Sequence, residues 1–164
     1  MLTLYEMYNR EGVQKLFQPD YNFKQSTGTW GLQGVIQLPN KQNDWVFFVT
    51  YGQSQAGHDF EEGITPDGVL TWQSQPGQTL SEKRVLRWIK QNVFGDKIHL
   101  FLREVDRIPY TYLGEISYLT HDEYRDCPVW FEFKLLDWDL LKDINKKFIR
   151  LPTTISNNFQ SVEK

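Results

Sequence analysis

The sequence predicts an α+β domain in which a mixed or antiparallel β-sheet curls around the core as a partial barrel, with two or three helices. First, 40% of the 164 residues are hydrophobic, which is enough for one domain to bury a core. Second, six Trp, eight Tyr and eleven Phe supply residue types that favour pleated sheet. Third, strand-like apolar runs are separated by turn-forming residues, and no linker divides them. We therefore expect one domain over residues 1–164.

The first elements are a short helix and a β-hairpin. Residues 10–17 carry apolar side chains at helical spacing, and a stretch dense in turn formers follows. Residues 30–37 and 44–51 are predicted strands, because β-branched and aromatic residues dominate both. The run WVFFVTY at 45–51 is almost continuously apolar, which predicts a central strand covered on both faces.

A long polar segment follows the hairpin. Residues 52–78 are rich in Gly, Gln and acidic residues, and only GVLTWQS at 68–74 is strand-like. Pro66-Asp67-Gly68 predicts a turn, because Pro sets the first φ and Gly accepts a positive one. A long polar loop inside a compact domain is uncommon unless it is functional.

A second helix is predicted over residues 81–93. Val85, Leu86, Ile89 and Val93 would share its apolar face. Residues 79–82 have the form of a capping box, and a glycine at 95 stands where a helix would stop.

The last part of the chain is predicted to complete the sheet. Residues 97–104, 111–119 and 129–136 have strand-like patterns. Residues 139–164 begin as a helix and end in polar residues typical of a frayed terminus.

Composition narrows the function classes. A formal net charge of −3 argues against a general polyanion binder, whose affinity comes from Lys and Arg on phosphates. One cysteine, Cys127, cannot form an internal disulfide, and no apolar run reaches the roughly 18 to 20 residues that span a membrane. The N-terminus lacks the layout of a signal peptide. We expect a cytoplasmic protein without membrane association.

Catalytic motifs are sparse. The three histidines lie far apart without the spacing of a zinc site, so we expect no metal and no cofactor. The chain has no Gly-x-Ser-x-Gly elbow, and its glycines match no phosphate-binding loop. The carboxylates of Asp59, Glu62 and Asp67 leave open a nuclease that uses a divalent ion.

Two Gln-Ser-Gln stretches, at 53–55 and 73–75, each follow an aromatic residue. Amides offer donors and an acceptor without charge, which suits the edge of a nucleobase, and aromatic rings add stacking of about 1 to 3 kcal/mol per base. Alternatively, the rings belong to the core and the amides cap loop backbone. The residues concerned are Tyr51, Gln53, Trp72, Gln73, Ser74 and Gln75.

Basic residues on the second predicted helix have two interpretations. They form either a solvated face or a local patch that contacts phosphates in an acidic protein. These residues are Lys83, Arg84 and Arg87, together with Arg103 on a predicted strand.

The chain resembles an uncharacterised C-terminal domain of large bacterial proteins that also carry a superfamily-two helicase and a phospholipase-D-like nuclease. The resemblance covers about residues 8–138 and implies a helicase or nuclease module as a partner, in the same or another polypeptide. It is carried, in order and spacing, by GTWGLQGVIQLPN, VFFVTYGQSQAGHDFEEGITPDGVLTWQSQPGQ, IHLFLRE, PYTYLGEISYLTHD and PVWFEFKLLDW.

A looser pattern is similar to SRA-like domains of modification-dependent restriction enzymes. It consists of DGVLTW, a Gly/Gln-rich turn, a helix, HLFLRE and YTYLGE. Those domains have a PUA-like, curled fold and hold a flipped modified base in a pocket. The resemblance implies a non-enzymatic DNA-binding reader of a modified base in restriction or antiviral defence. The alternatives are a metal-dependent nuclease and a protein-interaction module that docks on a helicase.

In this interpretation rings stack on the base, amides read its edge, a carboxylate accepts from an exocyclic amine, and cations hold phosphates of a modified duplex. The base-pocket residues are Tyr51, Gln53, Glu62, Asp67, Trp72, Gln73, Ser74, Gln75 and Tyr110, with Tyr112 as an alternative to Tyr110. The phosphate residues are Lys83, Arg84, Arg87 and Arg103.

Overall fold

The computed structural model describes residues 1–39, 43–52, 54–55, 58–59 and 61–151. The strands are β1 (Met7–Tyr8), β2 (Val35–Gln37), β3 (Trp45–Thr50), β4 (Ser54–Gln55), β5 (His58–Asp59), β6 (Gly63–Ile64), β7 (Val69–Gln73), β8 (Ile98–Arg103), β9 (Tyr110–His121) and β10 (Trp130–Leu135). The helices are α1 (Arg10–Phe17), α2 (Gly28–Leu32), α3 (Lys83–Ile89), α4 (Gln91–Phe94) and α5 (Asp143–Lys146). No helix in these described ranges is long and apolar enough to cross a membrane.

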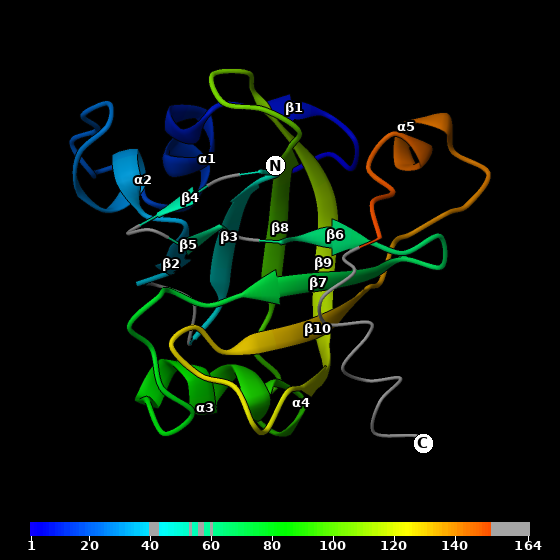
Figure 1. Cartoon of the computed structure of the whole chain (residues 1–164). Coiled ribbons are helices and arrows are strands. Elements are labelled where there is room, and N and C mark those ends of the chain that lie inside the picture. Colours follow the sequence, from blue (N-terminus) through cyan, green and yellow to red (C-terminus); the bar gives the residue numbers. More distant parts are fainter. Residues whose placement is uncertain (40–42, 53, 56–57, 60, 152–164) are drawn as a thin grey trace.

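The predicted α+β class with a mixed, curled sheet is confirmed. Eight strands form one sheet in the order β2-β3-β8-β9-β10-β7-β6, and β1 pairs with β9 beside this path. The β3–β8 pair is parallel and the other ladders of the sheet are antiparallel. In Figure 1, β7 and β10 cross β3, β8 and β9 steeply, so the two halves of the sheet curl toward each other.

Strand β9 produces the curl. Its first half pairs with β8 through Thr111 to Ile116, and its second half pairs with β10 through Ile116 to His121. Both ladders contain a register shift, a feature that bends a strand and increases its twist. The sheet therefore turns a corner along one long strand.

Successive side chains of β3 point alternately into two hydrophobic cores, as expected for a strand covered on both faces. Trp45, Phe47 and Val49 point into the space inside the curl, where rings from β7, β10 and α3 meet them. Val46 and Phe48 point to the opposite face, which α1 and α2 cover. The prediction of a buried central strand is confirmed.

The first part of the predicted hairpin is wrong, because residues 28–32 form helix α2 and only Val35–Gln37 is strand. Trp30 is fully buried and donates from Nε1 to Gln18 Oε1 at 2.8 Å. Gly31 lies so close to the Lys24 carbonyl that a Cβ there would sit 2.1 Å from its oxygen. This tertiary contact favours a helical turn over an extended strand.

The predicted second helix is present but divided into α3 and α4. Its C-terminal glycine, Gly95, has φ +71° as expected. The capping box is wrong, because the N-cap is Glu82 and it makes no side-chain cap bond. The predicted apolar face is wrong at Leu86, which is 40% exposed, and at Val93, which is 80% exposed because the helix breaks at Lys90. The buried ring of Trp88 takes the core position instead.

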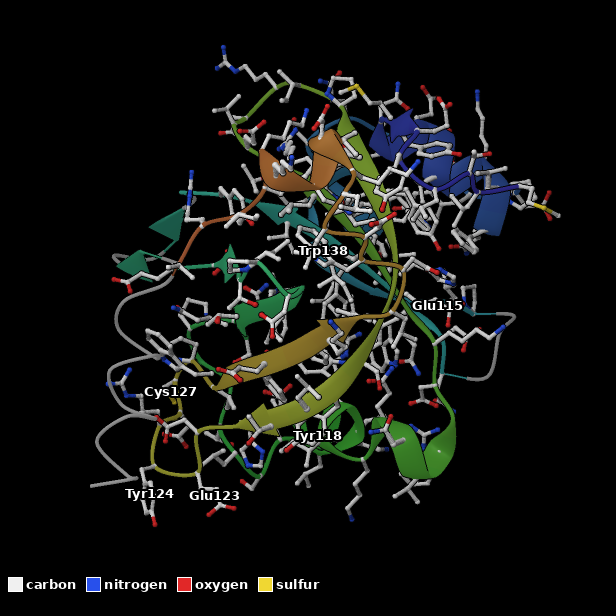
Figure 2. The ribbon with its side chains drawn as sticks, turned by 90° about the vertical axis from the view of Figure 1, so that its right-hand side faces the viewer. Glu115, Tyr118, Glu123, Tyr124, Cys127 and Trp138 are labelled. Carbon is white, nitrogen blue, oxygen red and sulfur yellow. The ribbon has the colours of Figure 1, made fainter. Side chains whose placement is uncertain are left out.

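The segment after β10 closes over the β6–β7 turn. Trp138, labelled in Figure 2, donates from Nε1 to the Pro66 carbonyl oxygen at 2.8 Å. Gly68 in that turn has φ +82°, and a Cβ there would lie 2.4 Å from the Trp138 ring. The predicted helical start of the tail is confirmed by α5, and the predicted frayed residues 152–164 lie outside the described residues.

Candidate functional site

A cavity of about 580 Å³ lies where the two ends of the curled sheet approach each other. Its volume falls within the roughly 300–1,000 Å³ of small-molecule sites. β2, β3 and the start of α1 line one side, and β7, the residue before β6 and α3 line the other. The lining residues are Arg10, Leu32, Gln33, Gly34, Val35, Phe48, Val49, Thr50, Glu62, Trp72, Gln73, Gln75, Gln78, Arg84, Trp88 and Tyr110.

The pairing register explains why this opening exists. β2 begins at Val35, which pairs with Phe47, so the last three residues of β3, up to Thr50, extend beyond the paired part of β2. On the other side β6 pairs with Leu70 and Thr71, so β7 continues past it. The uncovered ends of β3 and β7 face the same space, which makes the cavity the open seam of a partial barrel.

Two buried polar atoms at this seam have no hydrogen-bond partner among the described residues. They are Oε2 of Glu62 and Nε2 of Gln73, on side chains of residues that are 6% and 4% exposed. An unsatisfied buried polar group costs about 1 to 3 kcal/mol, and such groups are exceptions in folded proteins. Both residues line the cavity, so one carboxyl oxygen and one amide nitrogen without a hydrogen-bond partner among the described residues lie in its wall.

Burial also sets the charge of Glu62. Loss of solvent raises its pKa to about 8, although the charge of Arg150 opposes this shift. Burial therefore favours the protonated carboxyl, which can both donate and accept a hydrogen bond. The cavity offers neutral polar groups where the sequence predicted an ionised acceptor.

Trp72 belongs to the core and to the cavity wall. Its ring stacks on Phe47 with centroids 4.6 Å apart and meets Trp88 edge-on at 5.4 Å. The residue is only 6% exposed, yet it contributes to the lining. The interpretation of Trp72 as a core residue is therefore confirmed, and its ring is also a rigid part of the cavity wall.

An aromatic and cationic cluster forms the side of the cavity near α1. Tyr110 is buried and packs on Phe48 with centroids 4.8 Å apart. The guanidinium of Arg10 lies 4.5 Å from the Phe48 ring centre, and that of Arg103 lies 4.3 Å from the Tyr110 ring centre. Burial lowers the pKa of Arg10, which Tyr110 partly opposes and the charge of Arg103 reinforces.

Several predicted base-pocket residues do line this cavity. They come from residues 62–75 of the long polar segment and from β9, whereas the strand end before that segment contributes no predicted base-pocket residue among those described. They are Glu62, Trp72, Gln73, Gln75 and Tyr110.

Other predicted base-pocket residues have structural partners elsewhere. Tyr51 lies in the inner core, and its hydroxyl donates to the Phe148 carbonyl oxygen at 2.6 Å. Ser74 Oγ accepts from the Val129 amide at 2.8 Å. Asp67 is exposed on the β6–β7 turn and accepts from Thr65 Oγ1 at 2.5 Å. Gln53 lies outside the described residues.

Tyr112, the alternative for closing the pocket, is a core residue. Its hydroxyl and His99 Nδ1 are 2.9 Å apart, and its ring lies 4.9 Å from that of Phe101.

Of the four predicted phosphate-binding residues, two lie at or near the cavity and two are held by other side chains. Arg84 lines the cavity, and Lys83 is exposed at the start of α3. Arg87 instead forms a two-bond ion pair with Asp96, at 2.7 and 2.9 Å. Arg103 donates to Thr50 Oγ1 at 2.7 Å and pairs with an exposed carboxylate.

The nuclease constellation is not assembled among the described side chains. Glu62 faces the cavity, Asp67 lies on the exposed turn, and the Asp59 side chain lies outside what the structure describes. Within the described part of the chain, no group of three or more His, Cys, Asp or Glu could hold a metal ion.

Sequence reasoning missed the cavity residues Arg10, Gln33, Thr50 and Gln78. Gln78 accepts from the Gln75 amide and donates to Glu82, so it braces the loop that follows β7. Arg10 reaches the site from a helix that precedes Glu62 and Gln73 by more than fifty residues along the chain. Only the amide-rich context of Gln78 could have indicated its role in advance.

Comparisons with known proteins agree with the fold. A family model described as "Domain of unknown function (DUF3427)" matches residues 2–140. The search of curated proteins found no match. A crystal structure of the SUVH5 SRA domain with methylated CHH DNA is similar over 84% of this chain and 91% of that chain, with a TM-score of 0.53 and 10% identity. Another, with fully methylated CG DNA, covers 66% and 77%, with a TM-score of 0.45 and 12% identity. The predicted SRA-like fold is confirmed.

Proposed function

Because the chain belongs to the DUF3427 family and has an SRA-like fold, we propose that it is a DNA-binding reader whose seam cavity receives a modified base flipped from a duplex. The observation that carries the proposal is the pair of buried, unpartnered polar atoms, Glu62 Oε2 and Gln73 Nε2, in a cavity walled by aromatic rings. A flat, neutral ligand with polar atoms along its edge suits this lining.

The lining offers contacts that can offset the cost of placing a base in this cavity. Extruding a base costs a few kcal/mol, which stacking and edge hydrogen bonds must offset. Rings of Trp72 and Tyr110 provide apolar walls, while the amide of Gln73 and the protonated carboxyl of Glu62 provide directional contacts. Hydrogen bonds to these atoms would also remove the cost of leaving them unsatisfied.

The mouth of the cavity is suited to a nucleic-acid strand. Arg84 lies at the lining with its guanidinium 5.5 Å from the Trp45 ring centre, and it forms no ion pair among the described residues. Lys83 is exposed beside it on α3. In this proposal these two cations contact phosphates, and a helicase or nuclease module in the same or another polypeptide acts on the bound DNA.

The test is a binding panel at low salt. Matched duplexes carry unmodified, methylated, hydroxymethylated or glucosylated cytosine, or phosphorothioate linkages, and affinity is measured by fluorescence anisotropy. We expect one modification to bind more tightly than the unmodified duplex. Gln73→Ala should weaken that preferred complex about tenfold, the value of one hydrogen bond near 1.4 kcal/mol.

Gln37→Ala is the matched control, because Gln37 is exposed on β2 and bonds to Asn43 away from the cavity. Equal affinity for all duplexes, or equal effects of the two glutamine variants, would contradict the proposal. Cleavage of plasmid DNA with magnesium would instead support the nuclease alternative. Absence of any DNA binding would favour a module that docks on a helicase.

A further inference from the structure

A second hollow of about 520 Å³ adjoins the cavity behind the Arg10 side chain. Three residues line both spaces and form the wall between them: Arg10, Leu32 and Tyr110. The rest of the second hollow comes from the start of α1, the segment before α2 and the β8–β9 loop. Arg103 at the end of β8 and Arg107 on that loop add further cations to its lining.

Arg10 occupies this wall in a fixed orientation. Its Nη1 donates to the carbonyl oxygens of Trp30 at 3.2 Å and Gln33 at 2.8 Å. Its guanidinium lies against the rings of Phe48 and Tyr110, with centre distances of 4.5 and 5.7 Å. Backbone and rings hold the head group in place, which leaves it able to receive a ligand without further ordering.

The positive charge of Arg10 has no acidic partner among the described residues. The two carboxylates that line the second hollow face other cations: Asp106 lies 3.0 Å from Arg103, and Glu11 lies 3.9 Å from Lys15. Arg103 lies close enough that its like charge acts on Arg10. A partly buried cation without a counter-charge is costly, and an anion placed in this hollow would relieve that cost.

We propose that Arg10 binds the phosphodiester that flanks the flipped nucleotide, with the second hollow as the seat of that phosphate. The inference rests on the proposed function, because a base in the first cavity brings its own phosphate to the wall that the two hollows share. Arg suits this position, since its planar fork can donate two parallel hydrogen bonds to phosphate oxygens. The specific ligand is therefore a nucleotide in a strand, and a free base would satisfy only half of the site.

The experiment neutralises one phosphate at a time. Duplexes with the preferred modification carry a single methylphosphonate at each of the three phosphates nearest the modified base, or at a phosphate ten positions away. For the unmutated protein we expect one proximal substitution to weaken binding about tenfold or more, the value of a hydrogen bond to a charged group. The distant substitution should have a much smaller effect.

Arg10→Gln keeps a donor for the α2 carbonyls but removes the charge. This variant should bind the duplex without a methylphosphonate about tenfold more weakly than the unmutated protein does. It should lose no further affinity for the duplex whose proximal methylphosphonate weakens binding of the unmutated protein. Arg10→Lys should retain sensitivity to it. Lys97→Gln, at an exposed position before β8, is the control and should behave like the unmutated protein.

The outcomes separate the two proposals. If a modified duplex binds but Arg10→Gln remains as sensitive to the methylphosphonate as the unmutated protein, the assignment of Arg10 is wrong and the reader function stands. If no duplex binds at low salt, both are wrong. Loss of affinity in Arg10→Gln with full methylphosphonate sensitivity would indicate that Arg10 only supports α2.

Discussion

Glu62→Gln should remove a pH-dependent penalty on folding. Burial raises the pKa of Glu62 from an ordinary 4.5 to about 8, so the folded state favours the protonated carboxyl. The stability that this neutral form contributes is fully present below pH 4.5 and is lost as the pH rises to about 8. Gln has nearly the same shape and stays neutral throughout.

The size of the effect follows from the two pKa values. Their separation, at about 1.36 kcal/mol per pH unit, sets an upper limit of about 5 kcal/mol at pH 9. This is a large part of the roughly 5 to 15 kcal/mol that stabilises an ordinary domain. At pH 5 the two proteins should differ in free energy of unfolding by less than about 1 kcal/mol.

Urea unfolding followed by tryptophan fluorescence at pH 5, 7 and 9 measures the difference. Glu123→Gln is the control, because Glu123 is exposed on the loop that joins β9 and β10 (Figure 2). Parallel stability curves for Glu62→Gln and the unmutated protein would refute the argument that a buried, protonated carboxyl faces the cavity.

Three further outcomes follow from packing and charge. Trp72→Ala should lower the free energy of unfolding by about 3 to 5 kcal/mol in urea titrations, because it empties the centre of the inner core. Gly68→Ala should lower the melting temperature more than Gly52→Ala, since both have positive φ but only Gly68 has a ring against it. Arg84→Ala should reduce the salt dependence of DNA binding by about one unit of slope. Arg87→Ala should leave that slope unchanged, because its guanidinium is held by a carboxylate, and an equal effect of the two would count against the cavity as the DNA site.

Much of the fold could be predicted because its signals are local. The unbroken apolar run of β3 indicated a strand covered on both faces, and α1 has the predicted bounds. The error at residues 30–34 arose because contacts with residues outside that stretch stabilise the helical turn: Trp30 donates to Gln18, and Gly31 packs against the Lys24 carbonyl. Composition alone does not contain that information.

Cavity residues near the ends of strands could be predicted from the sequence, whereas the cavity residue Arg10, on helix α1, could not. Gln73 and Glu62 were chosen for their position around the long polar segment, and both line the cavity. Tyr51 was assigned to the site. It follows Phe47 and Val49 at every second residue, so its side chain points to the same face of the sheet and into the inner core. Arg10 gave no local signal, because its role depends on how α1 packs against β3.

The parallel pairing of β3 with β8 affects when the cavity forms during folding. A parallel pair needs a long crossover, and here the crossover between Thr50 and Ile98 carries β7 and α3, one complete side of the cavity. The other side is complete in sequence by Thr50 except for Tyr110 on β9. Contacts across such a separation form late in folding, because the entropy of closing the chain must be overcome first. Ligand binding should therefore be the last property to return on refolding, after the strands themselves are paired.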